Sequence, residues 1–240
     1  YLKSIVIVDP LDYPNFIKNY PKTDSAKKKY AIKAMKQITE YDLAISKWFQ
    51  GIEDAEYSLR YGENPQQKAK ALISNNLFKQ LSGEKKLSYN NLLDLDAALA
   101  ITYSANSKKY ICTIIKHNIP CGASIENNQI KSYTNALAGD PVSAFGGIVA
   151  FNKKVNVATA KNLIKNFYEV IAAPAFESEA LKILKRRKNL RVLKVKKFRS
   201  KVEQRSIFAG KLIQEVNSEK STIKKVYGKN KLNDEKINFF

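Results

Sequence analysis

Residues 147–173 read GIVAFNKKVNVATAKNLIKNFYEVIAA, and this stretch decides the fold class. The runs at 147–151 and 169–172 have the composition of buried strands, and the residues at 157–167 have helical spacing. Two strands joined by a helix form a βαβ unit, whose strands lie parallel in one sheet. The alternation continues outward, with further strands and helices predicted at 110–116, 131–138, 177–187 and 190–195. We therefore predict an α/β fold with a mostly parallel sheet and flanking helices.

The first hundred residues carry weaker signals. The β-branched run at 5–8 predicts a short strand, and the residues at 25–49 have the apolar spacing of one or two amphipathic helices. Glycine, asparagine and proline at 57–67 favour a structured loop, with a domain boundary near residue 55. Further on, Asn90-Asn91 is expected to cap a helix.

The charge of the chain is strongly positive. It has 240 residues, and 42 Lys and Arg against 22 Asp and Glu give a net charge of +20. Such a charge favours anionic partners. Only six of the basic residues are Arg, whose bidentate guanidinium group proteins use to read bases. The 36 Lys and 21 Asn share A-rich codons, so composition bias accounts for much of the charge. We expect no nucleic-acid partner, and a basic nucleic-acid-binding module is the alternative.

Sequence features also bear on the compartment and on the C-terminal part. Cys112 and Cys121 are too few for a disulfide framework, which predicts reduced thiols. No apolar run approaches the about 18–20 residues that cross a bilayer, and no signal peptide is evident. We expect a cytoplasmic protein with no membrane contact. The basic stretch 194–205 predicts a surface loop or a solvated strand edge, and 207–216 predicts one last strand.

The segment Lys116-His117-Asn118-Ile119-Pro120-Cys121-Gly122 follows a predicted buried strand, where we expect a loop that turns toward a helix. In parallel α/β sheets this carboxyl end is where ligands bind. His117 is the only histidine, and imidazole moves protons near neutral pH. Lys116 supplies a cation beside it. The alternative is a histidine held by a structural hydrogen bond.

A metal site is also considered for this segment. Cys112, His117 and Cys121 have the spacing C-x4-H-x3-C, which matches no common structural zinc pattern. The deaminase signature H-x-E…P-C-x-x-C is absent as well. We therefore predict no metal site and interpret Cys112 as a small core residue.

Two loops carry further candidate site residues. Arg60 and Tyr61 stand in Leu-Arg-Tyr-Gly-Glu-Asn-Pro-Gln-Gln at 59–67, where an arginine among phenol and amide groups suits a phosphate. A hydrogen-bonded turn with a surface arginine is the alternative. The second loop, Asp-Pro-Val-Ser-Ala-Phe-Gly-Gly at 140–147, lets the backbone approach a ligand at Gly146. The glycine patterns of dinucleotide and P-loop sites are both absent.

Taken together, these segments resemble the PurH family of bifunctional purine biosynthesis proteins, which combine AICAR transformylase with IMP cyclohydrolase. The resemblance spans nearly the whole chain. It rests in order on Arg60-Tyr61-Gly62-x-Asn64-Pro65, Leu87-Ser88-Tyr89-Asn90-Asn91 with Asp94 and Asp96-Ala97-Ala98, Lys116-His117-x-x-Pro120-Cys121-Gly122 and Asp140-Pro141-x-Ser143-Ala144-Phe145-Gly146-Gly147.

The resemblance implies formyl transfer from 10-formyltetrahydrofolate, the co-substrate, to the 5-amino group of AICAR. By motif position, His117 accepts or donates the proton at that amine, and Lys116 stabilises charge on the formyl oxygen. The implied nucleotide-binding residues are Arg60, most directly on the phosphate, Tyr61, Gly146 and Glu169. Gln66 departs from the family, which usually has His there; this removes an imidazole and keeps hydrogen bonding.

The resemblance also implies a domain organisation. Residues 1–55 correspond to the end of an α/β IMP cyclohydrolase-like domain and 56–205 to a cytidine-deaminase-like first transformylase subdomain. Residues 206–240 form a connector toward a second subdomain. Family members act as homodimers, so a homodimer is implied for the full-length protein. We expect these 240 residues to hold only part of the active site and to be inactive alone.

Overall fold

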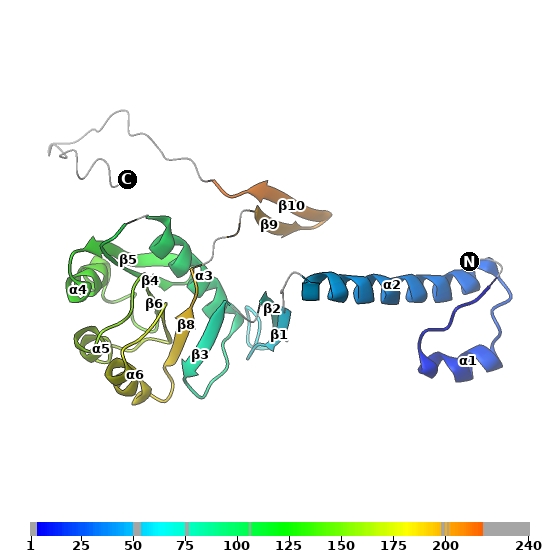
Figure 1. Ribbon diagram of the computed structural model, residues 1–240, viewed down its shortest axis with the longest axis horizontal. Helices are drawn as coiled ribbons and strands as arrows, with labels where there is room; N and C mark the ends of the chain where they lie inside the picture. The colour runs from blue at the N-terminus through cyan, green and yellow to red at the C-terminus, as the bar shows by residue number, and fades with distance from the viewer. Residues whose placement is uncertain are drawn as a thin grey trace. The chain divides into compact units, whose positions relative to one another are not determined.

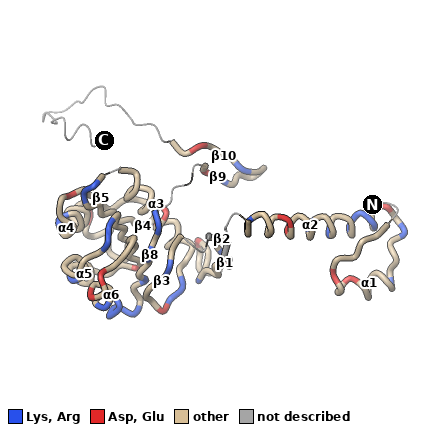
Figure 2. The backbone as a smooth tube through the Cα atoms, in the orientation of Figure 1, with Lys and Arg blue, Asp and Glu red and all other residues tan. Residues whose placement is uncertain are grey.

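The computed structural model in Figure 1 describes most of the chain, namely residues 4–49, 54–74, 77–105, 107–197, 200 and 202–217. The chain divides into two compact units, residues 1–197 and 198–240. Lys and Arg are spread over helices, strands and loops of the described part (Figure 2). In that part, no helix is both long and apolar enough to cross a bilayer.

A six-stranded sheet forms the centre of the first unit, in the order β3-β8-β7-β6-β4-β5. The parallel pairs are β6–β7 and β7–β8, whereas β3–β8, β4–β6 and β4–β5 are antiparallel. Four of the six strands thus run in one direction, and the expected parallel pairing is found among the central strands only. The strands comprise Phe78–Ser82 (β3), Tyr110–Lys116 (β4), Ile119–Glu126 (β5), Ile148–Phe151 (β6), Val170–Ala173 (β7) and Arg191–Val195 (β8).

Helices cover both faces of this sheet (Figure 1). One face packs against α4, α5 and α6, and the other against α3. Alternation along β6 explains the two layers, because Val149 and Phe151 enter one core while Ile148 and Ala150 enter the other. The α/β class with flanking helices is therefore confirmed. The helices comprise Tyr89–Ser104 (α3), Gln129–Gly139 (α4), Val157–Leu163 (α5) and Ser178–Lys185 (α6).

The start of α3 is fixed by a reciprocal cap. The Ser88 hydroxyl accepts from the Asn91 N–H at 3.2 Å, and the Asn91 side chain accepts from the Ser88 N–H at 3.1 Å. This pair satisfies two backbone donors that a helix start leaves free. The prediction that Asn90-Asn91 caps this helix is confirmed in part, because the Asn91 side chain belongs to the reciprocal cap while Ser88 occupies the N-cap position.

The N-terminal segment differs from its prediction. Residues 5–8 form no strand, and no strand of the described chain lies beside them to complete a ladder. A 3₁₀ turn, Pro10–Asp12 (η1), follows and is capped by the Asp9 carboxylate. The helices Tyr13–Lys18 (α1) and Asp24–Phe49 (α2) come next, so the predicted helical region is one continuous helix.

Two hairpin-like pairs complete the described chain. Asp54–Ser58 (β1) pairs antiparallel with Lys70–Ser74 (β2), and the predicted loop fills the interval between them. In the second unit, Val202–Ile207 (β9) pairs antiparallel with Gly210–Glu215 (β10). The exposed strand β9 agrees with the solvated strand edge predicted as an alternative for the basic stretch. The single strand predicted at 207–216 begins three residues later than expected, because residues 208–209 make a turn.

Candidate active site

The site residues suggested by the sequence converge on one edge of the six-stranded sheet. Lys116 ends β4 and His117 follows it, Gly146 lies two residues before β6, and Glu169 directly precedes β7. Because β4 runs antiparallel to β6, its carboxyl end meets the amino ends of β6, β7 and β8. The segment at 116–117 thus lies at the carboxyl end of β4, as expected from the sequence, whereas Gly146 and Glu169 lie at the amino ends of β6 and β7.

His117 and Asn118 form a two-residue turn between β4 and β5, and not the predicted loop toward a helix. Their φ angles are 53° and 64°, in the left-handed region that hairpin turns of this length use. The Asp94 carboxylate of α3 accepts from both backbone N–H groups, at 3.3 Å from His117 and 2.6 Å from Asn118. The imidazole-bearing residue is exposed at the tip of the turn.

Lys116 reaches from β4 to the loop before β6. Its Nζ donates to the Phe145 carbonyl at 2.6 Å, and that nitrogen lies 3.9 Å from where a Cβ on Gly146 would stand. Gly146 has φ of +74°, which favours glycine, and a ring atom of Phe167 lies 3.5 Å from the same position. The Gly146 N–H donates to the Phe167 carbonyl at 2.8 Å. A Cβ here would make ordinary van der Waals contacts, so the positive φ is the feature that favours glycine at this position.

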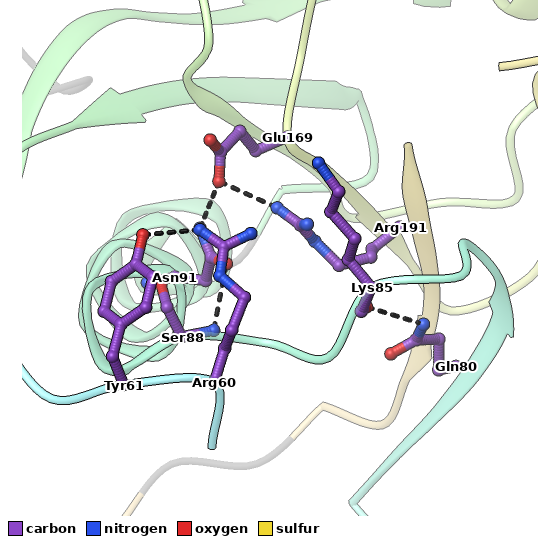
Figure 3. A network of polar contacts seen from close by, with 8 residues as sticks. All are labelled: Arg60, Tyr61, Gln80, Lys85, Ser88, Asn91, Glu169 and Arg191. Carbon is purple, nitrogen blue, oxygen red and sulfur yellow. Dashed lines mark hydrogen bonds and ion pairs between the residues drawn. The ribbon is translucent and has the colours of Figure 1, made fainter. Parts of the chain in front are cut away.

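A second cluster at this edge contains Arg60 and Tyr61 (Figure 3). The Arg60 guanidinium lies 4.5 Å from the centre of the Tyr61 ring and donates to the Tyr61 hydroxyl. Backbone hydrogen bonds fix both residues to the start of α3, since the Arg60 N–H donates to the Leu87 carbonyl and the Tyr89 N–H to that of Tyr61. A cation and a phenol are therefore held together in a fixed loop.

Glu169 is held from two sides (Figure 3). Its Oε2 accepts from Asn91 Nδ2 and from a terminal nitrogen of Arg191, each at 2.7 Å. Arg191 is 2% exposed and Glu169 35% exposed in this ion pair. Burial lowers the pKa of the Arg191 guanidinium, while the Glu169 charge raises it and the Arg60 charge lowers it further. The buried Nε of Arg191 has no hydrogen-bond partner in the described chain.

Backbone hydrogen bonds join these groups into one surface. The Gly146 N–H donates to the Phe167 carbonyl. The Glu169 N–H donates to the Gly147 carbonyl, and the Arg191 N–H donates to the backbone carbonyl of Glu169. The pairing of β6, β7 and β8 thus continues past their amino ends into the loops that carry the site. Gly146, Glu169 and Arg191 are therefore fixed relative to one another.

Sequence reasoning missed Arg191, and it left Asn91 out of the site. Both act on Glu169 from far along the chain, across 22 and 78 positions. One local signal for Arg191 exists: it stands in the run Leu-Arg-Val-Leu-Lys-Val at 190–195, a predicted strand rich in apolar residues. A buried arginine is almost always paired, so that position called for an acidic partner.

The loop at 59–67 is closed by its own hydrogen bonds, as the turn alternative predicts. The Gly62 N–H donates to the Gln67 carbonyl at 2.8 Å, and the Gln67 side chain accepts from the Asn64 N–H at 2.8 Å. Gln66 is exposed. The closed turn leaves the Arg60 side chain at its base, next to α3.

The cysteines lie apart from one another. Cys112 is buried in the core, and burial raises the pKa of its thiol well above the usual value. Cys121 is partly buried on β5; desolvation raises its pKa, Asp140 raises it further, and Lys116 opposes both. Within the described ranges, no group of three or more His, Cys, Asp or Glu residues could hold a metal ion.

The sequence is similar to those of known proteins. A family model described as AICARFT/IMPCHase bienzyme matches residues 1–238. The bifunctional purine biosynthesis protein PurH of Prochlorococcus marinus (strain MIT 9312) is 43% identical over 242 residues, covering 88% of this chain and 47% of that protein. PurH of Clostridium botulinum (strain 657 / Type Ba4) is 42% identical over 209 residues, covering 79% and 41%. The chain spans about half the length of the curated relatives it matches.

Among solved structures, a chain of Acinetobacter baumannii RibD, form 2, matches with a TM-score of 0.32 and 16% identity. The match covers 42% of our chain and 33% of the RibD chain, which is too little to define the fold. The sequence relationship is much stronger, since the family model extends over nearly all residues. The chain therefore belongs to the AICARFT/IMPCHase bienzyme family.

Proposed function

We propose that the protein to which this chain belongs transfers a formyl group from 10-formyltetrahydrofolate to the 5-amino group of AICAR, with IMP cyclohydrolase activity in the full-length form. The observation that carries this proposal is the convergence of Lys116, His117, Gly146 and Glu169 on one sheet edge in a chain of this family. The relatives give no support to the alternative of a basic nucleic-acid-binding module.

The proposed chemistry assigns separate roles to the two residues that end β4. The AICAR amine is a weak nucleophile because its lone pair is delocalised into the imidazole ring and the carboxamide. His117, at the tip of an exposed turn, takes the proton of this amine as the C–N bond forms. The bond between the formyl carbon and N10 of the folate then breaks, and N10 takes up a proton as tetrahydrofolate leaves. Lys116 stabilises the negative charge that develops on the formyl oxygen. Its ammonium group now contacts the neutral Phe145 carbonyl, and an oxyanion is a stronger acceptor.

The proposed nucleotide contacts follow from charge and space. Arg60 binds the phosphate, and Tyr61 holds the guanidinium in place. The backbone at Gly146 approaches the base. Glu169 carries an acceptor-only carboxylate, so it meets donor groups of the nucleotide and not its phosphate. Each of these residues comes from a segment fixed by backbone hydrogen bonds.

We also propose the finer organisation that the family implies. Residues 56–205 form a cytidine-deaminase-like subdomain, which comprises the six-stranded sheet and its four helices. Residues 1–55 close an IMP cyclohydrolase domain, and 206–240 connect to a second transformylase subdomain; 218–240 lie outside the described residues. The full-length protein acts in the cytoplasm as a homodimer that binds AICAR and folate.

The test is formyl transfer by the full-length gene product. With AICAR and 10-formyltetrahydrofolate, His117→Ala should lower kcat by about 10²–10⁴-fold, as expected for loss of a general base. His117 is exposed, so the variant should keep the wild-type circular dichroism and unfolding midpoint. The exposed Lys161→Ala on α5 is the control and should retain turnover. Wild-type turnover in His117→Ala would rule out the proposed role of this residue.

A further inference from the structure

The turn that presents His117 has an unfavourable backbone conformation. His117 and Asn118 both have positive φ, and a side chain with a Cβ disfavours this region because the Cβ crowds the following carbonyl. Asparagine tolerates the left-handed region, whereas histidine gains less from it. Turns of this length usually have glycine at the second position, as in Asn-Gly. The sequence His-Asn therefore needs support from elsewhere in the fold.

Asp94 provides two hydrogen bonds to this turn. One carboxylate oxygen lies 3.3 Å from the His117 nitrogen, and the other lies 2.6 Å from that of Asn118. In the left-handed turn that the structure shows, both N–H groups point toward this carboxylate. Each bond is charge-assisted, which makes it stronger than a bond to a neutral acceptor. The carboxylate thus favours the conformation that the side chains disfavour.

The support comes from a rigid element. Asp94 lies in the second turn of α3, whose start is locked by the reciprocal cap of Ser88 and Asn91. The next residue, Leu95, is buried against the sheet, as is Ala98 one turn later. Asp94 is separated from the turn by 23 and 24 positions along the chain. The turn is therefore positioned relative to the sheet by a contact from outside the hairpin.

We propose that Asp94 is the positioning residue of His117. Its two backbone hydrogen bonds hold the turn left-handed, and this fixes the place of the imidazole beside Lys116. Both oxygens are occupied by backbone N–H groups, so Asp94 acts through the turn and not as a proton acceptor for the ring. The link to catalysis rests on the proposed function of His117; the conformational part stands on the geometry alone.

The conformational test uses NMR spectroscopy on the 240-residue chain. His117 is the only histidine, so its imidazole signals are identified without ambiguity. In Asp94→Ala, the strong intraresidue amide–Hα NOE of a positive φ should weaken at His117, and the Asn118 amide should exchange at least about tenfold faster. Asp94→Asn keeps one acceptor and should give an intermediate result. Glu179→Ala, which removes an exposed carboxylate on α6, should change neither signal.

A second-site variant separates this role from general destabilisation. Glycine adopts the left-handed region without strain, so Asn118→Gly should restore the NOE at His117 in the Asp94→Ala background. A left-handed His117 in both Asp94→Ala and Asp94→Asn would overturn the proposal. Failure of Asn118→Gly to restore the turn would overturn it as well, because the support would then not act on the backbone conformation.

Turnover of the full-length protein tests the link to catalysis. Asp94→Ala should lower kcat by about 10–100-fold with little change in KM for AICAR, since a misplaced catalytic group affects the reacting geometry more than binding. Asn118→Gly should recover part of this loss. Unchanged turnover in a variant whose turn has changed would overturn the catalytic role of His117, whereas an unchanged turn overturns the role of Asp94.

Discussion

At the residue scale, the ion pair of Glu169 and Arg191 is unequal. The guanidinium is almost fully buried, whereas the carboxylate is about one-third exposed. A charge inside a protein depends on its partner for stabilisation, and a charge that touches water does not depend on it to the same degree. The two single substitutions should therefore have different costs.

We expect Glu169→Gln to destabilise the protein more than Arg191→Met. Glu169→Gln leaves a buried cation without a counter-ion, at a cost of about 3–5 kcal/mol, whereas Arg191→Met removes the cation and leaves a carboxylate that water and Asn91 still solvate. The double variant should be more stable than Glu169→Gln alone. Urea denaturation measures all three, with Arg187→Met as the control. Equal losses in both single variants would contradict this account.

The sequence was informative about site residues that stand in short motifs. Lys116, His117, Gly146 and Glu169 lie at one edge, and their segments were singled out from local composition and family resemblance. The local pattern around Arg191 indicates an acidic partner but does not identify Glu169, and Asn91 has no local signal for its contact. Which groups meet depends on which strands and helices become neighbours.

At the element scale, the β4–β5 hairpin shows why a local pattern misled. Pro120 and Gly122 favour a loop when only the sequence is considered. In the structure β5 is an edge strand, and the register shifts between Ile114 and Ile115 where Pro120 pairs. Proline is tolerated at such irregular edge positions because no ladder hydrogen bond is lost there. Edge position is a property of the sheet order, which 116–122 alone does not encode.

Gly122 has a packing role in this hairpin. A Cβ at this position would lie 1.9 Å from the Ala136 carbonyl oxygen of α4, so the helix packs directly on the strand backbone. We expect Gly122→Ala to lower the free energy of unfolding by at least about 1–3 kcal/mol, since α4 must move away from β5. Thermal denaturation measures this loss. The control is Ala123→Ser at the neighbouring exposed position, which should leave the free energy of unfolding nearly unchanged. An equally stable Gly122→Ala would show that α4 is free to shift.

At the scale of the whole molecule, the fold class was predictable and the sheet order was not. Every strand and helix predicted between residues 110 and 195 is found, and β5 at Ile119–Glu126 is an additional strand that was not predicted. The direction of β3 and β4 follows from the pairs β3–β8 and β4–β6, which join distant segments. The strand predicted at 5–8 does not form, because a strand also needs a neighbouring strand to pair its backbone groups.

The helix α2 exposes a large apolar surface. Its one buried residue in the described chain is Ala34, while many of its large apolar side chains face solvent. These exposed side chains are Ile32, Met35, Ile38, Tyr41, Leu43, Ile45, Trp48 and Phe49. Apolar surface of this extent on one helix is unusual for a helix in water.

Trp48 reports on this surface, because it is the only tryptophan and is 69% exposed. We expect the fluorescence of the 240-residue chain to be quenched readily by acrylamide and to have the emission maximum of a solvated indole. Trp48→Phe gives the background from tyrosine. A blue-shifted, protected emission would contradict the exposed position, and dependence of that shift on protein concentration would identify a second copy as the cover.

The hydrogen bonds that extend the sheet past β6, β7 and β8 affect what binding costs. Fixing the backbone of one flexible residue costs about 1–2 kcal/mol in conformational entropy. Gly146, Glu169 and Arg191 are ordered by the sheet before any ligand arrives, so a nucleotide would not bear that cost here. The backbone of this edge is therefore preorganised by the sheet itself.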